Sequence, residues 1–155
     1  MRSKTGAGIV AGLLAGVVFG VMMHVISTPM PMGGRMPMMM MMARVVRSES
    51  LVAGWIYLLV NSVVMGGIFG LLLGDRAARI GGGLAWGALY GILLWVLGAL
   101  VLMPLLLGME AFAPLTMAPM RPGTLASLGA HVLSGLILGG VFAGLYRREP
   151  AVLRP

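Results

Sequence analysis

The chain contains four long apolar stretches whose interiors carry no charged side chain, over residues 6–28, 51–73, 81–107 and 125–146. Each is long enough to cross a hydrocarbon core of about 30 Å as an α-helix, at about 1.5 Å per residue. Isolated strands are excluded there because lipid cannot pair with their backbone polar groups. The remaining segments are too short for a separate soluble domain. We therefore expect one all-α membrane domain over residues 1–155, a membrane four-helix bundle.

Composition supports a membrane protein and narrows its chemistry. The chain is 59% hydrophobic and 10% charged, with a mean hydropathy of +1.02, which lies outside the range of soluble domains. The first stretch is too long for the core of a signal peptide, and no small-residue cleavage site follows it, so we expect a retained helix. The absence of cysteine excludes disulfides, thiolate metal sites and covalently attached c-type haem.

The distribution of lysine and arginine predicts an orientation. Seven of these residues fall on the side that holds both termini and the connection 74–80: Arg2, Lys4, Arg76, Arg79, Arg147, Arg148 and Arg154. Four fall on the other side: Arg35, Arg44, Arg47 and Arg121. The bias places both termini in the cytoplasm. The net charge of +7 then reflects contact with anionic lipid headgroups, and no alternation of aromatic and basic residues indicates nucleic acid binding.

A weak internal repeat relates residues 6–74 to residues 81–147. At an offset of 75 the glycines of the first span fall on those of the third, and Pro29 falls on Pro104. At an offset of 73 the second span falls on the fourth, and Phe69 falls on Phe142. Each repeat holds two helices, so both halves enter the bilayer from the same side. We expect two duplicated transmembrane hairpins with parallel pseudo-twofold symmetry.

Glycines recur every fourth residue in the first and third spans and therefore form smooth helix faces. We expect helix packing through these glycines and through the matched glycine pairs of the second and fourth spans: Gly8, Gly12, Gly16, Gly83, Gly87, Gly91, Gly66, Gly67, Gly139 and Gly140. Packing within the chain is one interpretation of these faces. A homo-oligomer or a larger membrane complex, held by the same faces, is another.

Both histidines of the chain fall inside spans, where an ionisable residue is a candidate functional group. His24 lies about five residues before the expected end of the first span, and His131 about six residues after the expected start of the fourth. Both are thus expected about 7 to 10 Å below the outer boundary. Two neutral histidines bonded to backbone carbonyls or hydroxyls are the structural alternative.

Methionine is concentrated on the same outer half. Fourteen of the sixteen methionines lie there, eight of them between Met30 and Met42. Thioether sulfur is a soft, uncharged ligand that suits Cu(I), although methionine is also flexible apolar filler. Consecutive residues of a helix point 100° apart, so no more than two methionines of the run 38–42 can meet one ion. The candidate metal ligands are His24, His131, Met22, Met23, Met30, Met32, Met36 and Met103.

Three functions remain open from these residues. The first is a non-enzymatic protein that binds or passes a soft metal such as Cu(I) at an outward-facing methionine and histidine site. The second is an accessory or scaffold subunit of a larger membrane complex. The third is a b-haem protein with His24 and His131 as axial ligands. No pair of nucleophile and base, no phosphate-binding loop and no carboxylate dyad indicates an enzyme.

One segment also carries a family resemblance. The run from Trp95 to Met109, with Gly98, Pro104 and Gly108, resembles segments of small bacterial four-span membrane proteins. The stretch Gly129-Ala130-His131, followed by Gly139-Gly140-Val141-Phe142, is similar to them too. The resemblance implies a bacterial inner-membrane protein and carries no assigned activity.

Overall fold

The computed structural model describes residues 3–29 and 34–146, and it confirms the expected all-α class. The elements run in the order α1 (Lys4–Val25), β1 (Ser27–Pro29), β2 (Arg35–Pro37), α2 (Met38–Val45), α3 (Leu51–Leu73), α4 (Ile80–Leu94), η1 (Trp95–Leu102, a π-helix), α5 (Met103–Leu106), α6 (Ala113–Thr116) and α7 (Arg121–Leu145). Helices α1 and α3, the continuous helix Ile80–Leu106 and α7 are long and apolar enough to span a membrane. The four helices therefore indicate a membrane protein.

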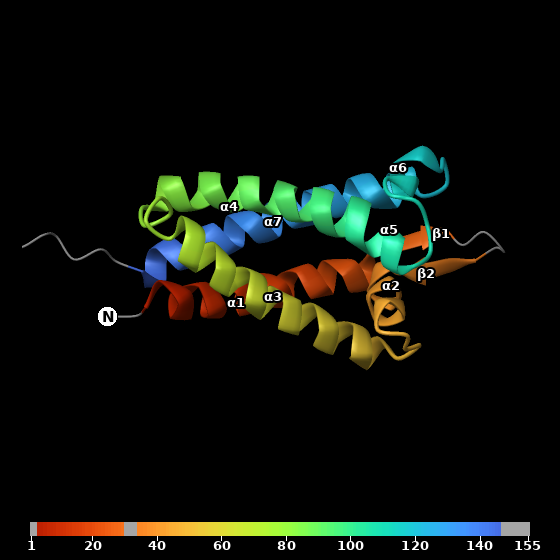
Figure 1. The fold of residues 1–155 in the computed structure, drawn as a ribbon, viewed down its shortest axis with the longest axis horizontal. Coiled ribbons are helices and arrows are strands. Elements are labelled where there is room, and N and C mark those ends of the chain that lie inside the picture. Colours follow the sequence, from red (N-terminus) through yellow and green to blue (C-terminus); the bar gives the residue numbers. More distant parts are fainter. Residues whose placement is uncertain (1–2, 30–33, 147–155) are drawn as a thin grey trace, which may run out of the picture.

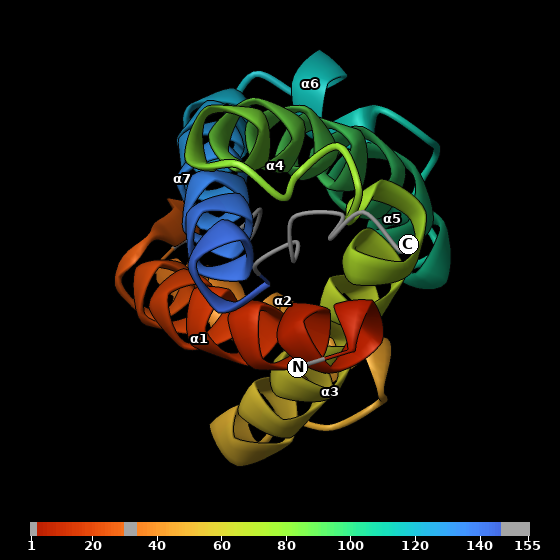
Figure 2. The same cartoon turned by 90° about the vertical axis from the view of Figure 1, so that its left-hand side faces the viewer.

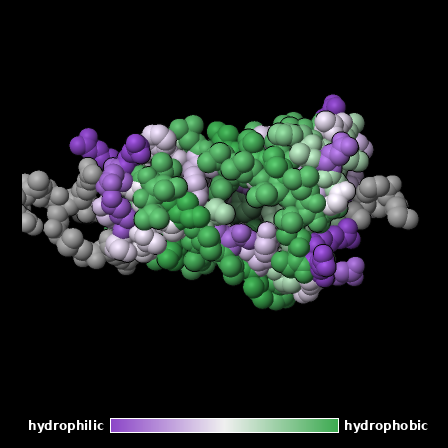
Figure 3. Space-filling model, viewed as in Figure 1, coloured by the Kyte–Doolittle hydropathy of each residue, from purple (hydrophilic) through white to green (hydrophobic). Residues whose placement is uncertain are grey.

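The four long helices run up and down along one axis (Figure 1). The start of α1, the end of α7 and the turn between α3 and α4 lie at one end, which we call the terminal end. The strands β1 and β2 and the short helices α2, α5 and α6 lie at the other, which we call the cap end. Hydrophilic residues gather at the two ends, and a broad apolar band lies between them (Figure 3).

The helices form two closely packed pairs. Helix α1 packs along α3, α4 packs along α7, and the contact between α1 and α7 joins the pairs. Seen along the axis, the four helices are arranged around a common centre (Figure 2). Within the described residues, α3 and the helix α4–η1 show no comparable close packing. The hydroxyl of Tyr90 bridges them by donating to the carbonyl of Met65 at 3.0 Å.

Glycine permits the close approach within each pair. A Cβ atom on Gly8 would collide with the carbonyl of Gly66, and one on Gly12 with the carbonyl of Ser62. In the second pair, a Cβ on Gly83 would collide with the carbonyl of Gly139, and one on Gly87 with that of Gly135. These backbones therefore touch directly, and such contact provides dispersion and weak Cα–H···O interactions.

The other glycines expected to pack divide into two groups. Gly16 lies against the side chain of Ser62, and Gly91 against the carbonyl of His131. Gly67 and Gly140 have only flexible side chains nearby, at 3.4 Å, so a Cβ there would make an ordinary or slightly tight contact. Gly20, which was not expected to pack, lies directly against the Trp55 ring.

The two pairs meet at a fully buried aromatic cluster. The rings of Phe69 on α3 and Phe142 on α7 are 5.5 Å apart in an edge-to-face arrangement, and neither side chain is exposed. Tyr90 adds a third ring, 5.3 Å from Phe69. Small alanines of α1 complete this core, because they let α1 approach without displacing the rings: Ala7, Ala11 and Ala15.

The third span changes from α- to π-helical hydrogen bonding over η1, just before Pro104. Proline has no N–H, so the carbonyl of Leu100 loses the donor that an α-helix would supply four residues later. The N–H of Phe112 replaces it at 2.7 Å, from the loop that follows. Thus Pro104 frees a carbonyl that fixes the loop between α5 and α6.

The cap end is more ordered than the expected outer loop. Residues 27–29 and 35–37 pair as short antiparallel strands, which no sequence pattern predicted. Helix α2 begins directly after Pro37 and contains the methionine run 38–42. Helix α2 packs against α3, and Met39 and Ala43 are completely buried. It therefore covers one end of the bundle, while Arg44 and Arg47 remain exposed.

Two helix ends differ from the predicted spans by more than two residues. Helix α1 ends at Val25, because the chain turns into β1, rather than at Thr28. Helix α7 begins at Arg121, four residues before the predicted start, with Pro122 in its first turn. Proline favours that position since its missing N–H would have no helical partner there. Both changes alter the depths estimated for the histidines.

We predict that the close contact between α4 and α7 makes Gly135→Ala destabilising. An added methyl would meet the Gly87 carbonyl, and overpacking of this kind costs about 1–3 kcal/mol. The matched control is Gly129→Ala on the same helix, where a Cβ has open space and the higher helix propensity of alanine favours folding. Thermal unfolding in mild detergent should show a lower Tm for Gly135→Ala only. Equal Tm values for the two variants would contradict the glycine contact.

Candidate methionine-lined cavities

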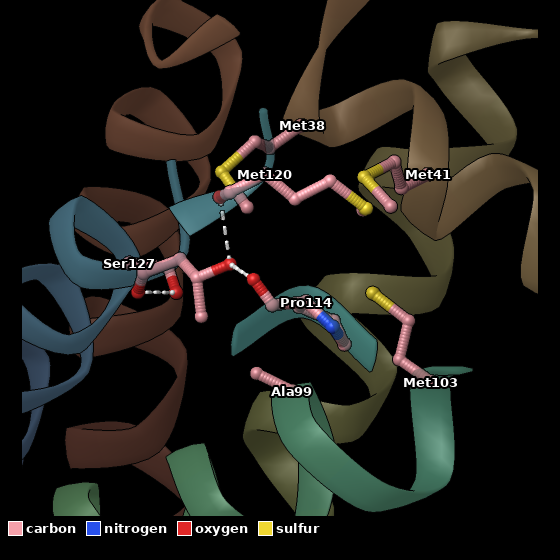
Figure 4. Close-up of a pocket in the computed structure, with 8 residues that line it drawn as sticks. Met38, Met41, Ala99, Met103, Pro114, Met120 and Ser127 are labelled. Atoms are coloured by element: carbon pink, nitrogen blue, oxygen red, sulfur yellow. Dashed lines mark hydrogen bonds between the residues drawn. The ribbon is translucent and has the colours of Figure 1, made fainter. Parts of the chain in front are cut away.

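Four methionines from three separate segments line one small cavity near the cap end. Met38 and Met41 come from α2, Met103 begins α5, and Met120 immediately precedes α7. Their side chains extend into the same space (Figure 4). The cavity has a volume of about 30 Å³, and its other lining residues are Ala99, Pro114, Thr124 and Ser127. A space of this size accommodates one ion or one water molecule.

Local structure accounts for each of the four positions. Met38 and Met41 are three residues apart in a helix and therefore lie on one face of α2. Met103 directly follows η1, so the π-helical turn before Pro104 determines where Met103 lies. The hydroxyl of Thr124 donates to the carbonyl of Met120 at 2.9 Å and lies 3.1 Å from the carbonyl of Pro114. Thr124 thus ties the Met120 backbone and the α6 segment to the start of α7.

Trp95 completes this support from η1. Its indole N–H lies 3.1 Å from the Ser127 hydroxyl and 3.3 Å from the Thr124 carbonyl. Ser127 in turn donates to the Thr124 carbonyl at 2.7 Å. Trp95, Thr124 and Ser127 are all buried, so these bonds satisfy polar groups that would otherwise be costly in an apolar setting. The network holds η1 against α7 through Thr124 and Ser127, which both line the small cavity.

The small cavity offers soft, neutral ligands and no charge. None of its lining residues carries a formal charge. Across residues 3–29 and 34–146 there is no group of three or more histidine, aspartate and glutamate side chains placed to hold a metal ion. The surroundings therefore suit a soft monovalent cation, which thioether sulfur stabilises, and do not suit a hard divalent cation, which requires oxygen ligands.

A larger cavity of about 490 Å³ adjoins the small one. The two share Met38, Ala99, Met103 and Ser127 as lining residues. The larger cavity lies among α1, α3, α7 and the helix α4–η1, with α2 contributing Met38 and Met42. A hollow is visible in the apolar band of the molecule, on the face where α3 and α4–η1 diverge (Figure 3).

His131 lines the larger cavity with its ring fixed from two sides. Its Nδ1 lies 2.7 Å from the carbonyl of Ser127, and its ring meets the Phe19 ring edge-on, with centroids 4.6 Å apart. Because a carbonyl oxygen only accepts, Nδ1 must carry the proton of this hydrogen bond. In the neutral ring, Nε2 then has a free lone pair.

His24 has a different environment. It is exposed, it lies in the last turn of α1, and its ring is 6.4 Å from that of Trp55. It lines neither cavity. Phe19, the neighbour of His131, precedes His24 by five residues, which is about 7.5 Å along α1. The equal depth estimated from the sequence is therefore wrong, because α1 ends earlier and α7 begins earlier than predicted.

The remaining predicted ligands are dispersed. Met23 is buried and lines the larger cavity, whereas Met22 is half-buried and packs in the cluster around Met23 and Met39. Met36 is half-buried in β2. Met30 and Met32 lie outside the described residues. Among the predicted metal ligands that the structure describes, Met103 is the one that lines the small cavity.

Met38, Met41 and Met120 were not among the predicted ligands. The three-residue spacing of Met38 and Met41 was a usable signal, since it places them on one helix face after Pro37. No sequence pattern connects them to Met103 or Met120, which lie more than sixty residues further along the chain. Their convergence depends on the return of α5 and the α7 start to the cap end.

Comparison with known proteins supplies no relative. No protein-family model, curated protein or solved structure matches the chain.

We predict unequal oxidation of two methionines near the cap end. Met117 is 43% exposed in the segment before α7, whereas Met39 is 0% exposed within α2, which packs against α3. Dilute hydrogen peroxide should therefore convert Met117 to its sulfoxide well before Met39, since exposure controls the reaction. Fragment-ion mass spectrometry measures both rates, and unfolding in a strong detergent should equalise them. Equal rates in the folded protein would show that Met39 is not buried and that α2 does not pack against α3.

Proposed function

We propose that the protein is a non-enzymatic membrane protein that binds Cu(I) in the small cavity lined by Met38, Met41, Met103 and Met120. The observation that carries this proposal is the convergence of four thioethers, from three segments, on a space of about 30 Å³. Random apolar filling does not require sulfur at each of these positions. Leucine would fill the same volume, with better-defined rotamers.

Charge and softness favour Cu(I) over other biological ions. An isolated charge is costly in an apolar site unless ligands replace its water. Cu(I) carries a single charge and binds thioether sulfur well, whereas Zn²⁺ and Mg²⁺ require anionic or oxygen-rich ligands that this cavity lacks. The adjoining cavity contributes further methionines and the Nε2 of His131, so a bound ion has neighbouring ligands to which it can pass.

The copper proposal predicts selective losses on substitution. Met41→Leu and Met103→Leu conserve volume, so they should fold normally while each removes one ligand. We expect at least a tenfold loss of Cu(I) affinity for each, since loss of even an outer-shell partner costs about 10- to 100-fold. Competition with a chromophoric Cu(I) chelator, on protein in mild detergent, measures the affinity.

Met117→Leu and His24→Ala are the controls for this experiment. Met117 and His24 are exposed and line neither cavity, so their replacement should leave Cu(I) affinity unchanged. Wild-type affinity in both cavity variants would refute the site. Loss of affinity in His24→Ala alone would instead support the ligand set expected from the sequence.

The proposed location is the bacterial inner membrane, with both termini in the cytoplasm. The sequence supports this orientation, because seven of the eleven lysines and arginines fall in the two terminal segments and the connection 74–80. It puts the cap end, and with it the four methionines, at the periplasmic side. A metal site there would face the compartment through which copper enters and leaves the cell.

The absence of cysteine makes the orientation directly testable. Glu49→Cys places a thiol at the exposed turn between α2 and α3, and Arg79→Cys places one at the exposed turn before α4. In intact bacterial spheroplasts, a membrane-impermeant maleimide should label Glu49→Cys only, and Arg79→Cys should react after lysis. The reverse pattern would place the termini outside the cytoplasm.

We also propose that the chain arose by duplication of one hairpin. The helix contacts support it, because the same two offsets that align the sequence also align the contacts. The Gly8–Gly66 contact becomes Gly83–Gly139, and Gly12–Ser62 becomes Gly87–Gly135. The matched residues Phe69 and Phe142 touch each other, as equivalent residues beside a twofold axis do.

The other two functions have less support. The glycine faces that a partner subunit would use are turned against each other within the chain, so they offer no surface to a second protein. Bis-histidine haem needs two imidazoles on opposite faces of one porphyrin. His24 is exposed beside Trp55, whereas His131 lies in the larger cavity, so this arrangement does not favour an axial pair.

A further inference from the structure

The larger cavity has an opening that the metal site does not explain. Its volume of about 490 Å³ falls within the range of small-molecule sites. Residues of α3 and of the helix α4–η1 line it from opposite sides, including Ile68, Leu72, Leu97 and Leu102. Because α3 and α4–η1 are not closely packed, the hollow lies in the apolar band rather than at a hydrophilic end (Figure 3). Its entrance therefore faces the hydrocarbon of a bilayer.

The lining is apolar with a few neutral polar groups. Within residues 3–29 and 34–146, no aspartate, glutamate, lysine or arginine lines the cavity. A charged head is therefore unsuited to it, because nothing within would compensate the charge. This excludes fatty acids and phospholipid headgroups as its specific ligands and leaves neutral molecules.

Three polar side chains in the lining have unused hydrogen-bonding capacity. Asn61 donates one N–H to the Tyr57 carbonyl at 2.9 Å, and its other N–H and its side-chain oxygen have no partner among the described residues. His131 uses Nδ1 and leaves Nε2 free. The hydroxyl oxygen of Ser134 is shielded from solvent and has no hydrogen-bond partner among the described residues. A serine hydroxyl can turn about its Cα–Cβ bond to reach a ligand.

Ser62 also lines the larger cavity, but its hydroxyl already has a hydrogen-bond partner. Its hydroxyl donates to the Leu58 carbonyl of its own helix at 2.8 Å, a common way to satisfy serine in an apolar helix. Ser134 also lines the cavity from a long helix, but it makes no such bond. Unsatisfied polar groups are costly in hydrocarbon, so their presence in one cavity indicates a ligand that pairs with them.

We infer that this cavity binds a neutral, lipid-soluble molecule with a compact hydrogen-bonding ring head and an apolar tail, the chemistry of an isoprenoid quinone. In the quinone, the ring carbonyls accept hydrogen bonds from Asn61 and Ser134. In the reduced quinol, a ring hydroxyl donates to Nε2 of His131. The tail leaves along the leucines and isoleucine between α3 and η1. An acyl chain alone fills the space but pairs with none of the polar groups.

The test uses a short ubiquinone with one isoprene unit as the probe. Titration calorimetry on the full chain in lipid nanodiscs should show saturable binding of this probe and no saturable binding of n-decane or decanoate. If n-decane competes with the quinone on equal terms, the cavity is an unspecific lipid groove and the inference fails.

Two glycine-to-phenylalanine substitutions, one inside the cavity and one outside it, provide the structural control. Gly98 lines the cavity, and a Cβ there meets nothing within 4 Å, so Gly98→Phe should fill the cavity and abolish quinone binding. Gly129 has equally open space but does not line the cavity, so Gly129→Phe should bind as wild type. Size-exclusion chromatography confirms that both are folded. Wild-type quinone binding in Gly98→Phe would overturn the inference. The inference would also fail if the wild-type protein were a dimer that Gly98→Phe dissociates, because a second copy of the chain would then occupy the opening.

A polar variant separates this site from the metal site. Asn61→Leu should weaken quinone binding about tenfold, the size expected for one lost hydrogen bond with a partner left unpaired. Its Cu(I) affinity should not change, because Asn61 does not line the small cavity. Met41→Leu should behave oppositely, since Met41 does not line the larger cavity. Unchanged quinone affinity in Asn61→Leu would refute recognition of a polar head.

Discussion

Direct backbone contact between glycines, within the pairs α1–α3 and α4–α7, determines much of the remaining structure. Side chains provide little hydrophobic drive between helices in lipid, so the contacts Gly8–Gly66 and Gly83–Gly139 must rely on close approach. Within each pair, the two helices pack their small-residue faces against each other. Larger side chains are then left to meet between the pairs, where Phe69 and Phe142 pack edge to face. The side between α3 and η1 has neither glycine contact nor such a cluster, and a cavity lies there.

The cap end depends on a second constraint, the missing N–H of Pro104. It leaves the Leu100 carbonyl to accept from Phe112, which brings the chain after α5 back over the bundle. That return carries Met120 and the start of α7 toward α2. The bonds from Trp95 and Thr124 then hold η1, α6 and α7 together. A backbone feature of the third helix thus helps to bring together four sulfur atoms that are distant in sequence.

The candidate site shows where sequence reasoning reaches its limit. His24 and His131 stand out in any reading of the sequence, because ionisable residues in apolar spans are rare. Their depths were misjudged because α1 turns into β1 after Val25 and α7 starts at Arg121, and helix ends depend on local contacts that hydropathy does not report. The methionine run predicted that no more than two of its members could meet one ion. Met38 and Met41 are the two that line the small cavity.

The sequence by itself determined the four helices, their up-and-down order and the glycine faces. Uncharged apolar length and the spacing of small residues are local properties that require no knowledge of neighbours. Tertiary structure alone decided which methionines share a cavity, where each histidine lies and which side of the bundle is open. Those outcomes depend on the relative placement of segments more than sixty residues apart, such as α2 and the start of α7. Long-range packing sets that placement, and hydropathy carries no information about it.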